Sequence, residues 1–385
     1  MYNRSRRSET SPASTTPSES YSEIGLAILD TNTADLEWAR HENLIAYAKR
    51  SPKDGYFDVW VAEPDGTGKR CLTSGNGFSR RHTGSVTWHP SGDYLVFTAQ
   101  NEDATGEKAD ELAIPGIGLN CNLWVMKGDG SKAWKLTDIP TDYKTPCGVI
   151  HPQFSNNGKK LLWAEALGEY HRIQSRSFAW GEWALASGDF VVENALPSLR
   201  NVRKFQPGEQ HSFYESHDFS PDNSKALFSG NLLSGQPVNG LDIYEFEFAV
   251  GDAKRLTDTL DDWDEHAHYS PDGKTIAWMS GRELNVQFPS VSRLDWQKYV
   301  KTELWMMNSD GSDQRRKTFF NQPGHPDYEW FQENVFRTPR VIVSDNSWSP
   351  DGKRMAATVA YESQWTEKWG SIRSMLLIMD LEKRG

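Results

Sequence analysis

The sequence predicts an all-β fold, a β-propeller of six blades. Two observations lead to this prediction. One short phrase recurs six times along the 385 residues, and a second hairpin phrase follows most of its copies. The copies begin between 50 and 79 residues apart, which leaves room for four antiparallel strands in each unit. Units of four strands that repeat in this way are typical of propeller blades.

The recurring phrase is an aromatic residue, a tight polar turn and a short apolar strand. Its turns include HPSGD, FSNNG, FSPDN, YSPDG and WSPDG. Proline fixes φ near the value that a turn needs and glycine accepts a positive φ, so each copy predicts a hairpin between two strands. The copies begin at Trp38, Trp88, Phe154, Phe219, Tyr269 and Trp348.

The second phrase supplies strands three and four of a blade, as in DVWVAEPDG, NLWVMKGDG, DIYEFEF and ELWMMNSDG. The last unit ends after LLIMDLE and lacks a fourth strand, whereas a spare strand, Ile24 to Asp30, precedes the first unit. We expect this spare strand to complete the last blade by pairing with Leu376 to Met379, because ring closure removes two exposed sheet edges. Residues 23–385 then form one propeller, and residues 1–22 form a disordered Ser/Thr-rich arm.

Composition excludes several classes of protein. The 53 acidic against 42 basic residues give a net charge of -11, which argues against nucleic acid and against an anionic membrane surface as partners. No run of eighteen apolar residues predicts a membrane span, and the first residues lack the apolar stretch of a signal peptide. Nucleophile-elbow, Walker-loop, H-E-x-x-H and G-x-G-x-x-G motifs are missing, which disfavours a serine peptidase or a nucleotide enzyme.

Loop length differs between the two faces of the predicted ring. The turns between strands one and two, and between strands three and four, are short, so we expect that face to be plain. The other face receives long insertions at 99–120, 165–178, 200–216, 281–302 and 319–344, which predicts a binding surface there. These loops carry aromatic residues suited to stacking on sugars, to anchoring a protein partner, or to packing the loops onto the blades: Tyr170, Trp263, Phe288, Trp296, Tyr299, Tyr328, Trp330, Phe331 and Phe336.

Polar residues precede each repeat aromatic, where they should line a central funnel at the long-loop face. The segment WDEHAHYSPDG places His266 and His268 on one side of a strand, which resembles half of a metal site. His151 or Asp345 could complete it for zinc, manganese, copper or calcium, with Asp264 and Glu265 as supporting partners. The alternative is that these histidines only hydrogen-bond water and backbone. The candidate metal ligands are His151, His266 and His268, and the candidate ligand-binding residues are these three with His217, Asp345, Trp263 and Trp330.

The Ser-Pro-Asp-Gly turns and the LWxMxxDG hairpins resemble the repeats of TolB-like propellers from Ile24 to the C-terminus. That resemblance implies a periplasmic or secreted protein. The superfamily includes partner-binding proteins, gating domains of peptidases and polysaccharide lyases. The H-x-H pair is similar to the metal-binding histidines of oligogalacturonate lyases, which implies a divalent ion that holds a uronate carboxylate during β-elimination.

Two functions therefore remain open from the sequence. The first is a propeller that binds or cleaves a saccharide or another small acidic ligand at the funnel histidines, with a divalent metal ion. The second is a non-catalytic module that docks a protein partner on the long-loop face.

Overall fold

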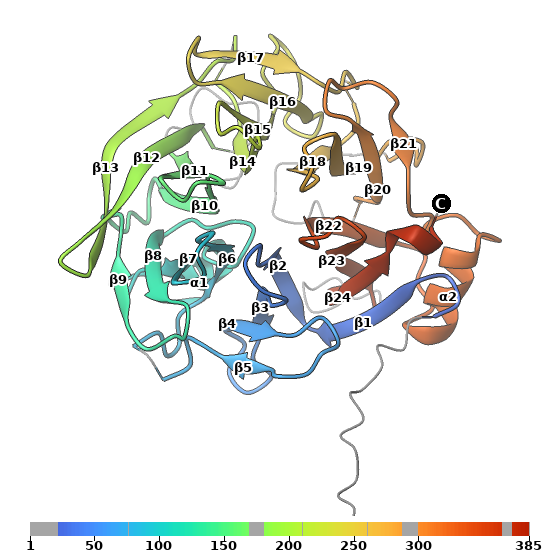
Figure 1. The fold of residues 1–385 in the computed structure, drawn as a ribbon, viewed down its shortest axis with the longest axis horizontal. Coiled ribbons are helices and arrows are strands. Elements are labelled where there is room, and N and C mark those ends of the chain that lie inside the picture. Colours follow the sequence, from blue (N-terminus) through green and yellow to red (C-terminus); the bar gives the residue numbers. More distant parts are fainter. Residues whose placement is uncertain are drawn as a thin grey trace, which may run out of the picture.

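The computed structural model describes residues 22–75, 77–168, 181–209, 211–259, 261–286, 299–363 and 372–384. Six four-stranded antiparallel sheets lie around a common axis like the blades of a propeller (Figure 1). Neighbouring inner strands contact one another in chain order, and the first contacts the last, so the ring is closed. The predicted six-bladed fold is confirmed.

The strands of each blade run outward from the axis in chain order. The first blade contains β2 (Thr33–Trp38), β3 (Ile45–Arg50), β4 (Phe57–Ala62) and β5 (Arg70–Cys71). The second contains β6 (Thr83–Trp88), β7 (Tyr94–Gln100), β8 (Cys121–Lys127) and β9 (Ala133–Lys135). The third contains β10 (Gly148–Phe154), β11 (Lys160–Ala166), β12 (Trp183–Glu193) and β13 (Leu196–Phe205). The fourth blade contains β14 (Tyr214–Phe219), β15 (Lys225–Gly230), β16 (Asp242–Glu247) and β17 (Asp252–Arg255). The fifth contains β18 (Asp264–Tyr269), β19 (Thr275–Ser280), β20 (Glu303–Asn308) and β21 (Arg315–Arg316).

The sixth blade joins the two ends of the chain. Its strands are β22 (Val341–Trp348), β23 (Arg354–Glu362) and β24 (Ile372–Asp380), and β1 (Leu26–Thr31) pairs antiparallel with β24 as the fourth strand. Leu26 lies opposite Met379 and Ile28 lies opposite Leu377. The predicted closure by the N-terminal strand is confirmed.

The inner turns of the blades have the geometry that the repeated phrase predicts. In the Ser-Pro-Asp-Gly turns, Gly273 and Gly352 both have φ of +70°. The preceding serine hydroxyl donates to the turn aspartate, as from Ser270 Oγ to Asp272 Oδ1 at 2.7 Å, and accepts from the backbone N–H of Thr275. The turn chemistry of the sequence therefore fixes each inner hairpin locally.

The hydrophobic core lies between neighbouring blades. One buried cluster joins Leu304 and Met306 of the fifth blade to Val343 and Leu377 of the sixth. The repeat aromatics Trp38 and Phe219 are each about 1 % exposed. Apolar residues on both faces of each sheet thus hold each blade against its neighbours.

The long-loop face differs from the prediction in one place. Residues 200–205 belong to strand β13 and not to a loop, because β12 and β13 continue as strands of 11 and 10 residues. Helix α1 (Glu107–Leu112) lies in the insertion at 99–120, and helix α2 (Pro326–Asn334) lies in that at 319–344. Tyr170, Phe288, Trp296 and nearly all of the N-terminal arm lie outside the described residues.

The three cysteines, Cys71, Cys121 and Cys147, are free thiols in the structure. In the described part of the chain, neither helix has the length and apolar character needed to cross a membrane.

Closure of the ring by β1 gives a stability prediction. Leu26 is 1 % exposed and packs in the core of the last two blades, whereas Ile28 on the same strand is 43 % exposed. Leu26→Ala should therefore lower the free energy of unfolding by about 2–4 kcal/mol, and Ile28→Ala by less than about 1 kcal/mol. Urea unfolding of both variants measures these changes. Equal losses of unfolding free energy would contradict the proposed contribution of the buried side of β1 to stability.

Candidate metal centre

Every inner strand changes register shortly before its repeat aromatic. In β10 the register shifts between Ile150 and Gln153, and in β18 between Glu265 and His268. His151 and His266 lie in these irregularities with positive φ values of +48° and +55°. A bulge of this kind redirects the side chains of a strand, and a positive φ in a non-glycine residue is strained, so the surrounding packing must hold it.

Side chains of one blade accept hydrogen bonds from the backbone of the next. The residue before the repeat aromatic accepts the N–H of the aromatic in a neighbouring blade, and this happens four times in the described structure. The pairs are Trp38 N to Ser347 Oγ at 3.0 Å, Phe154 N to Thr87 Oγ1 at 3.3 Å, Tyr269 N to Asp218 Oδ2 at 3.1 Å, and Trp88 N to Glu37 Oε2. Many of the polar residues around the axis therefore satisfy backbone donors on the unpaired edges of inner strands.

Three further side chains converge from three successive blades. His151 of β10, Glu215 of β14 and His266 of β18 each offer one ligand atom, and these atoms all lie within 4.8 Å of one another. His151 Nε2 lies 3.2 Å and His266 Nδ1 lies 3.6 Å from Glu215 Oε1. All three residues are 4–6 % exposed. We call this group the His–Glu–His cluster.

His266 is held in position by its backbone, while its side-chain Nδ1 makes no hydrogen bond. Its backbone N–H donates to His217 Nε2 at 3.2 Å, and its Nδ1 has no hydrogen-bond partner among the described residues. A buried imidazole nitrogen without a partner is costly unless it binds a proton donor or a metal ion. His217, a predicted ligand-binding residue, thus positions the backbone of His266.

The structure places His268 next to the cluster but outside it. His268 Nε2 and His266 Nδ1 lie 3.6 and 3.7 Å from the same oxygen, Asp345 Oδ1. Both histidines of the H-x-H pair therefore face Asp345, but His268 lies further along the axis than the His–Glu–His cluster. Of the three predicted metal ligands, His151 and His266 come together, and the third member of the cluster is Glu215 in place of His268.

Trp263 and Trp330 pack into the fold. Trp263 is 2 % exposed in the core that includes Met279 and Val300, and Trp330 on α2 packs against the core of the last two blades. Among the expected supporting partners, Asp264 accepts from the indole of Trp278, and Glu265 interacts with Glu215.

The sequence analysis missed Glu215. A signal was present, because Glu215 and Glu265 both stand four residues before the repeat aromatic of their blades.

The protonation of the cluster follows from burial and from charge repulsion. Burial and the nearby Glu265 raise the pKa of Glu215 well above its usual value, and burial raises the pKa of Glu265 to about 7. Burial lowers the pKa of His266 to about 3. In the described ranges, the ion pairs of Glu215 and Asp345 involve only histidines. The cluster thus places the neutral imidazole of His266 among crowded carboxyl groups that have no Lys or Arg partner, a state that a cation would stabilise.

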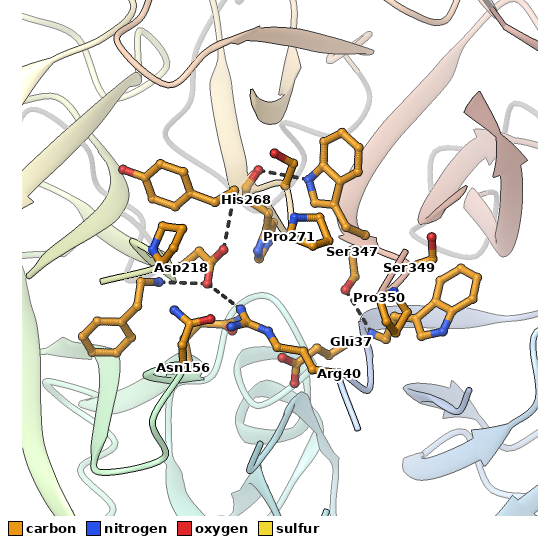
Figure 2. Close-up of a pocket in the computed structure, with 16 residues that line it drawn as sticks. Glu37, Arg40, Asn156, Asp218, His268, Pro271, Ser347, Ser349 and Pro350 are labelled. Carbon is orange, nitrogen blue, oxygen red and sulfur yellow. Dashed lines mark hydrogen bonds and ion pairs between the residues drawn. The ribbon is translucent and has the colours of Figure 1, made fainter. Parts of the chain in front are cut away.

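A cavity of about 150 Å³ opens at the other end of the axis, on the face with the short turns (Figure 2). Arg40, Asn156, Pro271 and Pro350 of four inner turns line it, with Asp218 and several others deeper inside. We call it the short-turn pocket. The prediction that this face is plain is wrong, because the polar residues before the repeat aromatics reach through to it. These residues, with the aromatics, line its wall: Glu37, Asp218, His268, Ser347, Trp38, Phe219, Tyr269 and Trp348.

Comparisons with known proteins agree with the fold and leave the function open. No family model matches the chain. A dipeptidyl-peptidase 5 from Porphyromonas endodontalis is 23% identical over 249 residues, which is 58% of this chain and 32% of the peptidase. The chain spans about a third of the length of the curated relatives it matches.

Solved structures share the architecture at low identity. An oligogalacturonate lyase from Vibrio parahaemolyticus has a TM-score of 0.50 and 11% identity, with 92% of this chain and 79% of the lyase covered. A TolB-type protein from Agrobacterium tumefaciens has a TM-score of 0.47 and 16% identity, with 82% of each chain covered. At these identities the likeness concerns the fold alone.

The buried carboxyl group of Glu37 gives a pH prediction. Burial raises its pKa from 4.5 to about 7. Its proton therefore stabilises the folded state fully below pH 4.5, and this contribution is lost as the pH rises through 7. In Glu37→Gln the contribution does not titrate, so the stability of the variant relative to the wild type should rise by about 2–3 kcal/mol between pH 5 and pH 8.

Urea unfolding at the two pH values measures this difference. The matched control is Glu247→Gln, which changes an exposed carboxylate of β16 and should show no such rise. A relative stability of Glu37→Gln that stays flat with pH would show that this carboxyl group titrates normally.

Proposed function

We propose that the protein binds a divalent transition-metal ion on the propeller axis through His151, Glu215 and His266. The observation that carries this proposal is the convergence of three ligand atoms from three blades within 4.8 Å, including a buried nitrogen without a hydrogen-bond partner. Two imidazoles and one carboxylate suit zinc or manganese better than calcium, which prefers oxygen ligands.

The ligand that the ion would hold is an acidic one. Three protein ligands leave at least one coordination position open, and a metal ion at that position binds carboxylate oxygen well. An acidic saccharide is the class that the similarity of the H-x-H pair to oligogalacturonate lyases supports. Because none of the described ion pairs places Lys or Arg beside Glu215 or Asp345, a proton-abstracting base for lyase chemistry is not assigned.

The metal proposal predicts a loss of affinity on single substitutions. Glu215→Gln and His266→Ala should each weaken Zn²⁺ or Mn²⁺ binding by at least about 100-fold, because each removes one of three ligands. Calorimetric titration of the metal-stripped protein measures the affinity, and elemental analysis measures the metal content as purified. His41→Ala is a matched control on an inner turn. Wild-type affinity in both cluster variants would overturn the proposal.

The proton held by the carboxyl groups predicts the direction of the pH dependence. Glu215 must lose its proton before it can bind a metal ion, and its pKa is raised. Metal affinity should therefore increase as the pH rises, by up to about tenfold per unit while Glu215 is protonated, with release of protons on binding. In Glu265→Gln the pKa of Glu215 should fall, because the neighbouring charge is gone, so the pH dependence should become weaker. Calorimetry in buffers of different ionisation enthalpy counts the released protons, and an affinity that falls with rising pH would contradict this assignment.

A second candidate is a module that docks a protein partner without catalysis. Two observations favour it: several polar residues at the axis already have structural partners in the next blade, and a curated relative is a peptidase several times the length of the matched segment. Absence of metal binding in the titration above, together with capture of a specific protein, would put this function first.

A further inference from the structure

We propose that the short-turn pocket is a second binding site, specific for an ammonium or guanidinium group carried on an aliphatic stem, and that Arg40 occupies it as a tethered ligand. The pocket lies at the opposite end of the axis from the long loops. The proposal does not depend on metal binding at the His–Glu–His cluster.

Arg40 reaches its partner from the opposite side of the ring. Arg40 lies in the turn between β2 and β3 of the first blade, and its Nη2 lies 3.2 Å from Asp218 Oδ1 of the fourth blade. The first and fourth blades stand on opposite sides of the ring (Figure 1). Figure 2 shows the Arg40 side chain extending across the pocket toward Asp218, with Glu37 beside it. The guanidinium group thus spans the mouth of the ring.

The two partners are held very differently. The side chain of Asp218 is 3 % exposed, whereas that of Arg40 is 40 % exposed. The carboxylate of Asp218 also accepts the backbone N–H groups of Phe219 and Tyr269, which fix its orientation. Among the described residues, the only hydrogen bond from the guanidinium group of Arg40 goes to Asp218. Asp218 is therefore a preformed, buried acceptor, and Arg40 is a partly exposed group that reaches it from the turn of another blade.

The chemistry of the pocket wall also favours a cation. Two buried carboxyl groups, Glu37 and Asp218, line the pocket. A buried carboxylate binds ammonium and guanidinium groups by charge-assisted hydrogen bonds. Anions such as phosphate or a carboxylate would meet repulsion from the carboxylate of Asp218. The amide and hydroxyl groups of Gln153, Asn156 and Ser347 complete the polar lining.

The test removes the tethered ligand and adds a free one. Arg40→Ala should bind methylguanidinium at least tenfold more tightly than the wild type, because the competing side chain is gone. Nuclear magnetic resonance titration measures the affinity at millimolar concentrations, with acetate as the anionic probe. Arg70→Ala removes an exposed arginine whose guanidinium group donates to the backbone carbonyls of Gly128 and Asp129, away from the pocket, and it should bind methylguanidinium as the wild type does.

A second variant and a second probe complete the test. Arg40→Ala/Asp218→Asn should lose the gained affinity, and circular dichroism checks that it folds. The affinities of Arg40→Ala for a short arginine-containing peptide and for methylguanidinium are then compared. A higher affinity for the peptide indicates that the cationic group belongs to a peptide ligand, and equal affinities indicate a small cationic molecule.

The proposal fails if Arg40→Ala binds methylguanidinium no better than the wild type. It also fails if Arg40→Ala binds acetate in preference to methylguanidinium. Both outcomes can be measured with Arg40→Ala alone, so they do not depend on whether Arg40→Ala/Asp218→Asn folds.

Discussion

The inner edges of six strands impose the main constraint on this structure. Each inner strand pairs on one side only, so backbone N–H groups near the axis need acceptors from elsewhere. In six places of the described structure the acceptor is a side chain of a neighbouring blade, namely Glu37, Thr87, His217, Asp218, Asp345 or Ser347. An apolar axis would leave these donors unsatisfied, at a cost of about 1–3 kcal/mol each. A closed ring therefore requires polar side chains along its axis, whatever else these side chains do.

The same constraint creates the chemistry of the site. Polar residues crowd into a narrow space, and the register shifts of the inner strands turn His151 and His266 toward Glu215. Burial then separates the protonation states: it lowers the pKa of His266 to about 3 and raises that of Glu265 to about 7. Asp345 is also buried, yet the hydrogen bond from His268 and the charges of the histidines lower its pKa to about 2. The neutral imidazole of His266 beside crowded carboxyl groups is an arrangement suited to a cation.

The sequence predicted the fold more fully than the site. The repeated aromatic and turn phrase predicted the number of blades, and the missing fourth strand of the last unit pointed to closure by residues 24–30, which the structure shows as β1 at Leu26–Thr31. The sequence does not predict the strand at residues 200–205, because no turn residues distinguish this segment from a loop. His151 and His266 could be predicted from their shared repeat position. Glu215 could not be assigned, because contacts between blades depend on bulges and on the twist of each sheet, which periodicity alone does not reveal.

The most direct test of the account is the position of a bound metal ion. Crystals soaked in Mn²⁺ or Zn²⁺ and measured at the absorption edge should show one anomalous peak on the axis, about 2.0–2.2 Å from ligand atoms of His151, Glu215 and His266. A strong peak at His268 and Asp345 without these three residues, or no peak on the axis at saturating metal, would contradict the assignment.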